Sequence, residues 1–285
     1  MTVMSASPAA TGHPSMEAVA VDRWRDGRTE TAMDMAAAEV PVSLEYNGIS
    51  HAVMLASPSD LEDFAIGFSL TEGIVDHPGD ILDLEVDERC EGFAVRLTIA
   101  SARFHRLKQH RRTLAGRTGC GLCGAESLSQ VFRDIAPVAA TARMKPSALQ
   151  GAFMDLAANQ PLQRLTGATH AAAWAEPDGT VVLIREDVGR HNALDKLVGA
   201  MALAGIDAAA GAAMVTSRAS YEMVQKAAAT GIGILAAISA PTVLAIRMAE
   251  ALNLTLVGFA RRDHHVLYAG RQRIGESDPS EGVAP

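Results

Sequence analysis

Cysteine is scarce in this chain, and its N-terminus lacks the pattern of a secretory signal. Three cysteines among 285 residues, Cys90, Cys120 and Cys123, are too few, and odd in number, for the disulfide scaffold of a secreted protein. The first residues show neither the basic stretch nor the apolar stretch of a signal peptide. Both absences predict a cytoplasmic protein.

Aromatic residues are also rare. They make up 4% of the chain, whereas apolar residues of all kinds make up 48%. The core is therefore expected to consist of small and aliphatic side chains in closely packed helices and sheet. Residues 227–246 carry no charge, but Gly231, Gly233, Ser239 and Pro241 interrupt them. We predict a buried strand over residues 233–238 rather than a membrane span, and no membrane partner.

Acidic residues exceed basic ones, and the formal net charge of −8 argues against nucleic acid as a general partner. Acidic residues are nevertheless absent from residues 92–125. The basic residues of that segment are Arg96, Arg103, His105, Arg106, Lys108, His110, Arg111, Arg112 and Arg117. Cys120 and Cys123 lie at its end, among glycines 116, 119, 121 and 124. Nearby cations lower the pKa of a thiol and favour the thiolate, which is the reactive form.

The spacing of Cys120 and Cys123 leaves several interpretations open. A zinc site needs further ligands, and only Cys90 and scattered histidines remain. A zinc deaminase needs a His-x-Glu motif, which the chain lacks. A thioredoxin-like centre needs a turn between a strand and a helix, whereas the surrounding glycines favour a mobile carrier of persulfide sulfur. A cysteine pair without chemistry is the remaining alternative.

The first half of the chain alternates in the manner of strands before helical patterns begin. Asn47-Gly48 between two alternating runs predicts a hairpin, and Ser59 with Glu62 predicts a capping box at a helix start. We expect a disordered tail over residues 1–20, a hairpin over 40–55, a helix over 59–73, strands over 82–86 and 93–99 with Cys90 at their turn, a basic helix over 102–117, and a helix over 126–135.

The second half alternates helices and strands, which predicts an α/β fold with a partly parallel sheet. Ligands of such sheets bind beyond the carboxyl ends of the strands. The predicted helices span 146–159, 192–204, 221–230 and 241–251, and the strands span 171–175, 181–186, 212–216, 234–238, 255–259 and 266–268. We therefore predict an α+β domain over 21–115, a mobile cysteine loop and linker over 116–145, and a C-terminal domain over 146–285.

Three polar clusters and one histidine fall at the predicted strand ends. In residues 185–196, Arg190 and His191 at a helix start are candidates to bind phosphate. The alternative is an internal network of ion pairs among Arg185, Asp187, Arg190 and Asp195. His170 is either a base or ligand or a polar group satisfied within the fold.

The other two clusters follow the later strands. Arg218 is a second phosphate candidate, and Ser220 is expected to cap a helix. Arg261 and Arg262 form a pair suited to phosphate. Asp263 is suited to the hydrogen-bond donors of a guanine edge. A plain polar turn is the alternative for residues 259–264.

Taken together, these motifs resemble the FdhD family, the sulfurtransferases that are accessory to formate dehydrogenase. The resemblance extends from about Val40 to Ile274. The matching segments are residues 59–74, 116–124, 166–172, 185–196, 217–229, 234–241 and 256–261. Ala168 and Ser217 stand where the family often has glycine, so each adds a side chain where a backbone can approach a ligand.

The resemblance implies a function. Such proteins accept sulfur as a cysteine persulfide from a cysteine desulfurase. They pass it to molybdenum, or tungsten, in Mo-bis(molybdopterin guanine dinucleotide), the cofactor of formate dehydrogenase. By motif, Cys120 is the carrier and Cys123 its partner. The matching cofactor-binding segment is Phe259, Ala260, Arg261, Arg262, Asp263 and His264.

The resemblance also implies a homodimer and a C-terminal domain similar to cytidine deaminases but without a metal of its own. Guanine-dinucleotide recognition further implies that the chain binds GDP. The alternatives are an assembly chaperone that binds the cofactor without transferring sulfur, and a thiol-disulfide oxidoreductase.

Overall fold

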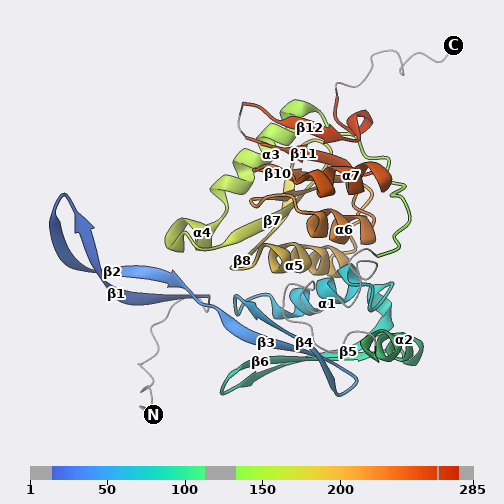
Figure 1. Ribbon diagram of the computed structural model, residues 1–285, viewed down its shortest axis with the longest axis horizontal. Helices are drawn as coiled ribbons and strands as arrows, with labels where there is room; N and C mark the ends of the chain where they lie inside the picture. The colour runs from blue at the N-terminus through green and yellow to red at the C-terminus, as the bar shows by residue number, and fades with distance from the viewer. Residues whose placement is uncertain (1–14, 113–132, 262, 276–285) are drawn as a thin grey trace.

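The computed structural model describes residues 15–112, 133–261 and 263–275 (Figure 1). Cys120, Cys123 and Arg262 lie outside this part of the chain, as does most of the helix expected over residues 126–135. The described residues form three sheets. One is a two-stranded arm, one has four strands, and one has six. The mixed α/β fold class is confirmed.

The arm is an antiparallel hairpin of β1 (Met16–Arg25) and β2 (Arg28–Ala37) that projects from the body (Figure 1). Asp26 and Gly27 turn the chain with φ of 51° and 77°. The disordered tail expected over residues 1–20 is therefore wrong for Met16–Ala20, and residues 1–14 lie outside the described part. The arm buries little surface. Cross-strand pairing holds its two strands together. Because little of the arm is buried, its strands lack the hydrophobic alternation that identifies a half-buried strand.

The four-stranded sheet has the order β4-β3-β6-β5. The predicted Asn47-Gly48 turn is confirmed, with φ of 47° and 79°. The Asn47 side chain also bonds both backbone groups of Ile99, which joins the turn to the end of β6. Cys90 is exposed at the β5–β6 turn, as predicted. The strands are β3 (Val40–Tyr46), β4 (Ile49–Ala56), β5 (Ile81–Arg89) and β6 (Gly92–Ile99).

Helix α1 (Leu61–Thr71) covers one face of this sheet, and its Phe64 and Phe68 lie in the core, as expected. The predicted capping box is wrong. The helix begins after Asp60, which has a φ of 53° and makes no capping bond through its side chain. Ser59 instead accepts a hydrogen bond from Ser15, just before the arm. The short helix η1 (Pro78–Asp80) and the basic helix α2 (Ser101–Arg112) complete this part.

The six-stranded sheet has the order β12-β11-β10-β9-β7-β8. Strands β9, β10 and β11 are parallel and fully buried, which confirms both the partly parallel sheet and the buried strand expected over residues 233–238. None of the described helices is long and apolar enough to cross a membrane. The strands are β7 (His170–Ala175), β8 (Val181–Asp187), β9 (Ala212–Val215), β10 (Ile234–Ala237), β11 (Thr255–Gly258) and β12 (Val266–Ala269).

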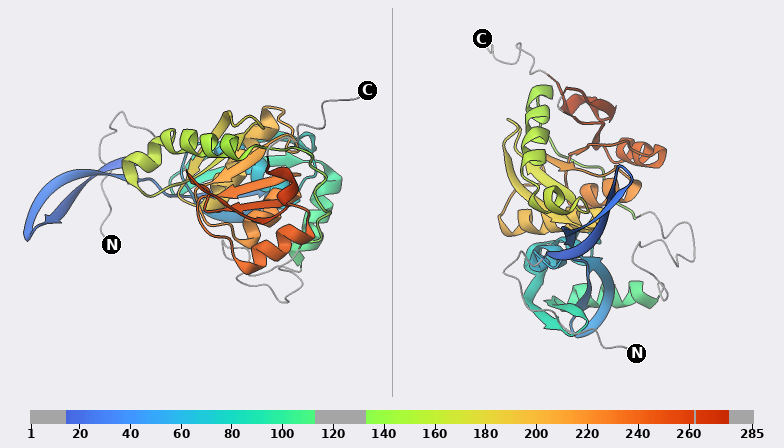
Figure 2. Two further views of the ribbon diagram at one scale, coloured as in Figure 1. Left: turned by 90° about the horizontal axis from the view of Figure 1, so that it is seen from above. Right: turned by 90° about the vertical axis from the view of Figure 1, so that its left-hand side faces the viewer.

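Helices cover both faces of this sheet (Figure 2). Side chains alternate along each strand, so Ala171 and Ala173 face α3 whereas Ala172 and Trp174 face α5. Helix α3 (Pro146–Ala158) packs on one face. The helices on the other face are α5 (Arg190–Leu203), α6 (Tyr221–Ala229) and α7 (Val243–Ala251). Two short helices, α4 (Pro161–Thr166) and η3 (Arg271–Arg273), complete this part.

The linker expected over residues 116–145 packs tightly from Arg133 onward. Arg133 donates from its guanidinium to the carbonyl of Thr71 and from its backbone to Gln225. Val138 and Ala140 lie in the core between the six-stranded sheet and α5. Residues 133–135 are not helical, so the end of the helix expected over residues 126–135 is wrong. Here apolar contacts rather than helical hydrogen bonds hold the chain.

The two large sheets are joined through the contact of α1 with α5 (Figure 1). Two glycines allow the helix backbones to touch. A Cβ atom at Gly67 would lie 1.7 Å from the carbonyl oxygen of Asp195, and one at Gly199 would lie 1.9 Å from that of Asp63. Any larger residue would therefore push the helices apart. This contact fixes how the N-terminal part sits on the C-terminal part.

Candidate functional site

The sheet brings the predicted site residues to one of its edges. The parallel strands β9, β10 and β11 end there. Strand β7 runs antiparallel to both neighbours, so it begins there, and β8 ends there. His170 stands opposite Asp187 in the register, and Ala171 exchanges backbone and hydroxyl hydrogen bonds with Thr216. The segments that begin α5 and α6 therefore lie on either side of His170.

The first turn of α5 presents the basic groups of the first cluster. Gly189 occupies the N-cap position and has no side chain with which to cap the helix. The first amides of a helix have no partners within it and favour anions. Arg190 Nε is buried without a hydrogen-bond partner among the described residues. His191 Nε2 lies 2.9 Å from Glu222 Oε2, in the first turn of α6.

His170 is half-buried beside this turn. Burial lowers the pKa of His170, and the positive charges of Arg190 and His191 lower it further against the opposing effect of Asp187. The imidazole is therefore neutral at pH 7, with one nitrogen free to accept a hydrogen bond. His170, Arg190 and His191 thus lie close enough for their charges to interact.

The second cluster follows β9. Arg218 is exposed, and Ser217 donates from its hydroxyl to the carbonyl of Arg218. Ser220 stands at the N-cap position of α6, but its side chain makes no capping bond, so the predicted cap is wrong. Its hydroxyl is buried and lacks a hydrogen-bond partner within the described part of the chain. Thr242 at the start of α7 does cap its helix, by accepting from Ala245 N.

The third cluster follows β11. Phe259 has a φ of 50°, which is rare for a residue with a side chain. The backbone N–H groups of Phe259 and Ala260 donate to Ser239 and Ala237, so this segment lies beside the end of β10. Ala260 is buried and Arg261 is exposed at the edge.

Hydrogen bonds also link Arg261, Asp263 and His264. Arg261 N donates to His264 O at 2.9 Å. Asp263 and His264 form an exposed pair 2.7 Å apart, and this hydrogen bond lowers the pKa of Asp263. The described residues of this segment thus make the polar contacts of the alternative interpretation, and Arg261 still lies at the same edge as Arg218. Arg262 lies outside the described residues.

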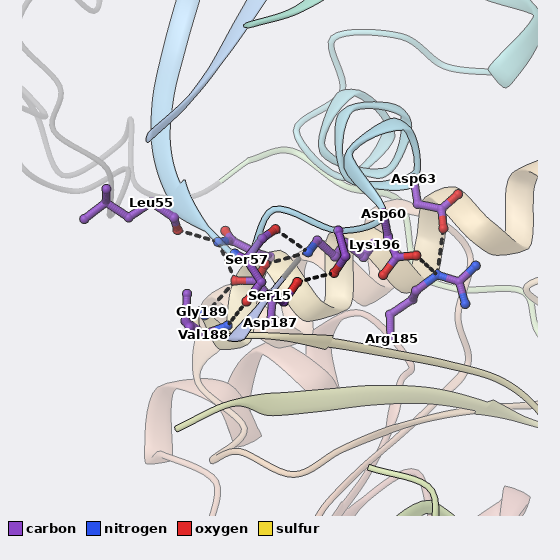
Figure 3. A network of polar contacts seen from close by, with 12 residues as sticks. Ser15, Leu55, Ser57, Asp60, Asp63, Arg185, Asp187, Val188, Gly189 and Lys196 are labelled. Atoms are coloured by element: carbon purple, nitrogen blue, oxygen red, sulfur yellow. Dashed lines mark hydrogen bonds and ion pairs between the residues drawn. The ribbon is translucent and has the colours of Figure 1, made fainter. Parts of the chain in front are cut away.

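The internal ion-pair network expected as an alternative for residues 185–196 is wrong. Arg185 and Asp195 pair with residues outside the motif, whereas Asp187 pairs with Lys196 within it. Arg185 pairs with Asp63 of α1 at 2.6 Å (Figure 3). Asp187 pairs with Lys196 at 2.8 Å, and Asp195 pairs with Lys226 of α6 at 3.0 Å. Since the acids of the motif are used in this way, Arg190 keeps its positive charge at the edge.

Sequence reasoning missed Glu222. Glu222 lies in the first turn of α6, four residues after Arg218. Its carboxylate pairs with His191 in the first turn of α5. Burial raises its pKa, but the hydrogen bond from His191 and nearby positive charges outweigh burial and leave the pKa lowered. Only its position in the first turn after a strand end could have indicated a role.

The donor groups at this edge suit an anionic, phosphate-bearing ligand. Two helices, α5 and α6, begin there without a side-chain cap, and Arg190 Nε and Ser220 Oγ are buried without hydrogen-bond partners in the described part. Within that part, no three His, Cys, Asp or Glu side chains come together as they would around a metal ion. The fold is that of an α/β protein whose candidate site lies at the carboxyl ends of its parallel strands.

The chain belongs to the FdhD/NarQ family, whose model matches residues 37–275. A protein of Cupriavidus necator called sulfur carrier protein FdhD is 60% identical over 270 residues, 94% of each chain. A protein of the same name from Bordetella petrii is 55% identical over 86% of this chain and 88% of its own. Another, from Xanthomonas campestris pv. campestris, is 53% identical over 95% of this chain and 96% of its own.

A solved structure shares the fold. It is the crystal structure of a protein from Desulfotalea psychrophila assigned as a formate dehydrogenase accessory protein. The TM-score is 0.75 at 22% sequence identity, over 92% of this chain and all of the other.

Proposed function

We propose that this chain is a sulfur carrier in the maturation of formate dehydrogenase, and that it acts as a sulfurtransferase. One observation carries the proposal. A member of a family whose relatives are called sulfur carriers has a Cys-x-x-Cys pair after a basic segment, and the buried, unpartnered Arg190 Nε and Ser220 Oγ at the sheet edge support a site for an anion there. The pair provides a thiol to hold sulfur, and the edge provides a place for a phosphate-bearing acceptor.

The first step is transfer of sulfur to Cys120. The Cys120 thiolate attacks the outer sulfur of a persulfide on a cysteine desulfurase. A sulfur–sulfur bond forms to Cys120, the bond to the donor cysteine breaks, and the donor leaves as a thiolate. The basic residues before Cys120 favour the attacking thiolate.

The second step delivers the sulfur. The thiolate of Cys123 attacks the inner sulfur of the Cys120 persulfide, which forms a disulfide and releases hydrosulfide. No external oxidant is needed, because the outer sulfur leaves with the electron pair. The acceptor is the molybdenum or tungsten centre of Mo-bis(molybdopterin guanine dinucleotide), which is cargo rather than a resident cofactor.

The sheet edge holds this acceptor through its phosphates and guanines. Arg190, His191 and Arg218 bind phosphate, His170 accepts a hydrogen bond, and the segment from Phe259 to His264 binds a guanine dinucleotide. The unpartnered Arg190 Nε and Ser220 Oγ support this assignment. A homodimer, a cytoplasmic location and the likeness to cytidine deaminases stay predictions that follow from the resemblance.

Mass spectrometry tests the transfer. After incubation with a desulfurase and cysteine, we expect one added sulfur on Cys120, none in Cys120→Ala, and full loading in the Cys90→Ala control. Failure to load Cys120 in the wild-type chain, or equal loading of Cys120→Ala, would disprove the carrier assignment.

Complementation separates this function from its rivals. In cells that lack the endogenous protein, Cys120→Ala is expected to leave formate dehydrogenase inactive. Rescue by a variant without either cysteine would favour an assembly chaperone. Reduction of insulin disulfides by the purified chain would favour a thiol-disulfide oxidoreductase. GDP is the probe for the edge, and a calorimetric titration without heat of binding would contradict the guanine site.

A further inference from the structure

A charged pair lies buried directly beneath the first turn of α5. Asp187 lies at the end of β8, and Lys196 lies within α5. Both residues are fully buried. Lys196 Nζ lies 2.8 Å from Asp187 Oδ2. The two groups form an ion pair with each other, and the charge of Asp187 still acts on His170 at the predicted ligand edge.

The N-terminal part of the chain completes this pair (Figure 3). Ser57, in the corner between β4 and α1, donates its backbone N–H to Asp187 Oδ2 at 2.9 Å and accepts from Lys196 Nζ at 3.0 Å. The Ser57 hydroxyl also accepts from Val188 N at 3.2 Å. One residue from the other half of the molecule thus contacts the acid, the base and the backbone that leads into α5.

The second oxygen of Asp187 holds the helix start itself. Asp187 Oδ1 accepts from Gly189 N at 2.7 Å and from Asn192 Nδ2 at 2.9 Å. Asn192 donates in addition to the carbonyl of Leu55, at 2.8 Å. Gly189 and Asn192 bracket Arg190 and His191 in the chain, so one buried carboxylate holds both flanking residues, through the Gly189 backbone and the Asn192 side chain.

Stability alone does not account for this arrangement. Removing two charges from water costs several kcal/mol, and a buried ion pair is often no more stabilising than apolar residues of similar size. What the pair does provide is geometry, because Asp187 Oδ1 accepts from Gly189 and Asn192 at the start of α5, whereas Oδ2 contacts Lys196 further along α5 and accepts from Ser57 of the N-terminal part.

We propose that Asp187, Lys196 and Ser57 are positioning residues, which hold the first turn of α5 so that Arg190 and His191 are oriented toward a phosphate-bearing ligand. The inference rests on the proposed function for the identity of that ligand. It adds that the N-terminal part sets the geometry of a site made by the C-terminal part.

The test compares full-length chains that carry Asp187→Asn, Lys196→Met or Asp63→Asn. Asp63 is the matched control, because its carboxylate also forms a buried pair between the two parts, with Arg185, but makes no contact with Gly189 or Asn192. Calorimetric titration with GDP, thermal unfolding, and hydrogen exchange of the amides from Val188 to Ala193 are measured for each chain.

We expect Asp187→Asn and Lys196→Met to bind GDP at least about tenfold more weakly and to exchange these amides faster, whereas Asp63→Asn loses thermal stability with GDP affinity and exchange nearly unchanged. Asp187→Asn separates position from charge. Removing a negative charge near phosphates would by itself tighten GDP binding, so tighter or equal binding in this variant would overturn the proposal.

Two further outcomes are decisive. If the wild-type chain does not bind GDP, the guanine site of the proposed function falls, and hydrogen exchange alone judges the positioning role. Unchanged exchange at Gly189 and Ala193 in Asp187→Asn would then refute it. If Lys196→Met does not fold, Ser57→Ala replaces it, because this change removes only the hydrogen bond to Val188 N.

Discussion

Residues 185–196 supply charges to two different surroundings within a few residues of each other. Asp187, Asp195 and Lys196 are at most 1% exposed, and each is ion-paired within the C-terminal part and hydrogen-bonded to Ser57 or Thr71 of the N-terminal part. Arg190 and His191 are half-buried at the sheet edge, where Arg190 keeps a donor without a hydrogen-bond partner in the described part. One short motif thus serves both an interface and a site.

The comparison shows how a fold keeps a cation available for a ligand. An acid close to Arg190 would neutralise it and reduce its attraction for phosphate. Here Asp187 and Asp195 bind Lys196 and Lys226, and the acid at the edge, Glu222, pairs with His191, so Arg190 forms no ion pair in the described part of the chain. The buried carboxylate of Asp187, which binds Lys196, also holds the start of the helix that carries Arg190.

The interface is most sensitive to loss of a buried cation. Lys226→Met leaves the carboxylate of Asp195, which is 1% exposed, without a counter-charge. Breaking a buried pair in this way costs about 3–5 kcal/mol of unfolding free energy. Urea denaturation measures the loss. Lys145→Met, at an exposed position, is the control and is expected to be neutral. If Lys226→Met left the unfolding free energy unchanged, the distinction between paired charges at the interface and a free cation at the edge would be contradicted.

Close backbone contact gives the next largest effect. Gly199→Ala places a methyl group 1.9 Å from the carbonyl oxygen of Asp63, so α1 and α5 must separate. Overpacking of this kind costs about 1–3 kcal/mol. Gly151→Ala is the matched helical control, because its Cβ meets nothing within 4 Å. Denaturation should show a clear loss only for Gly199→Ala, and equal behaviour of both variants would contradict the tight contact.

At the edge, the expected effect is on binding and not on stability. Arg218→Ala and Arg261→Ala each remove an exposed cation near the ligand, which should weaken GDP binding by about tenfold, while unfolding changes by less than about 0.5 kcal/mol. Arg271→Ala, exposed near the opposite edge of the sheet, should leave GDP affinity unchanged. Calorimetry decides, and equal losses for all three arginines would indicate only general charge attraction.

The smallest effect concerns pH. Burial, with Arg190 and His191, holds the pKa of His170 below its usual 6.5. The unfolded chain takes up this proton first, so the native state loses stability as pH falls below about 6.5 and until the folded pKa is passed. In His170→Gln, the unfolding free energy should therefore fall less steeply as pH decreases. The slope should change by only a fraction of about 1.4 kcal/mol per pH unit, because His170 is half-buried and screened by solvent.

Urea denaturation at pH 7.5 and pH 5.5 checks the His170 prediction, with the exposed His77→Gln as control. A decline of equal slope in His170→Gln and in the wild-type chain would exclude His170 as its source.

Much of the fold was predictable because local patterns agree with it. The Asn47-Gly48 turn, the phenylalanine face of α1 and the alternation of buried strands with helices depend on residues close in sequence. The placement of Arg190, Arg218 and Arg261 at one edge followed from the rule that ligands bind beyond the carboxyl ends of the strands, whereas that rule did not place His170. Family membership is confirmed as well.

The missed features depend on distant partners. Nothing near Ser59 or Ser220 indicates that the first bonds Ser15 and that the second makes no cap. The charges of residues 185–196 looked like an internal network because their partners Asp63 and Lys226 are far away in sequence. The arm was missed because paired edges without a buried face have no periodicity to detect.

The glycine contact between α1 and α5 has a consequence for how the molecule comes apart. Two parts joined by a loose, polar surface can move and melt separately. Here backbone meets backbone at Gly67 and Gly199, and charged groups are buried on both sides of that contact. Either half alone would expose this contact and would separate Arg185 from Asp63 and Lys226 from Glu72. The chain should therefore melt as one cooperative unit, and its two halves should not work as separately expressed proteins.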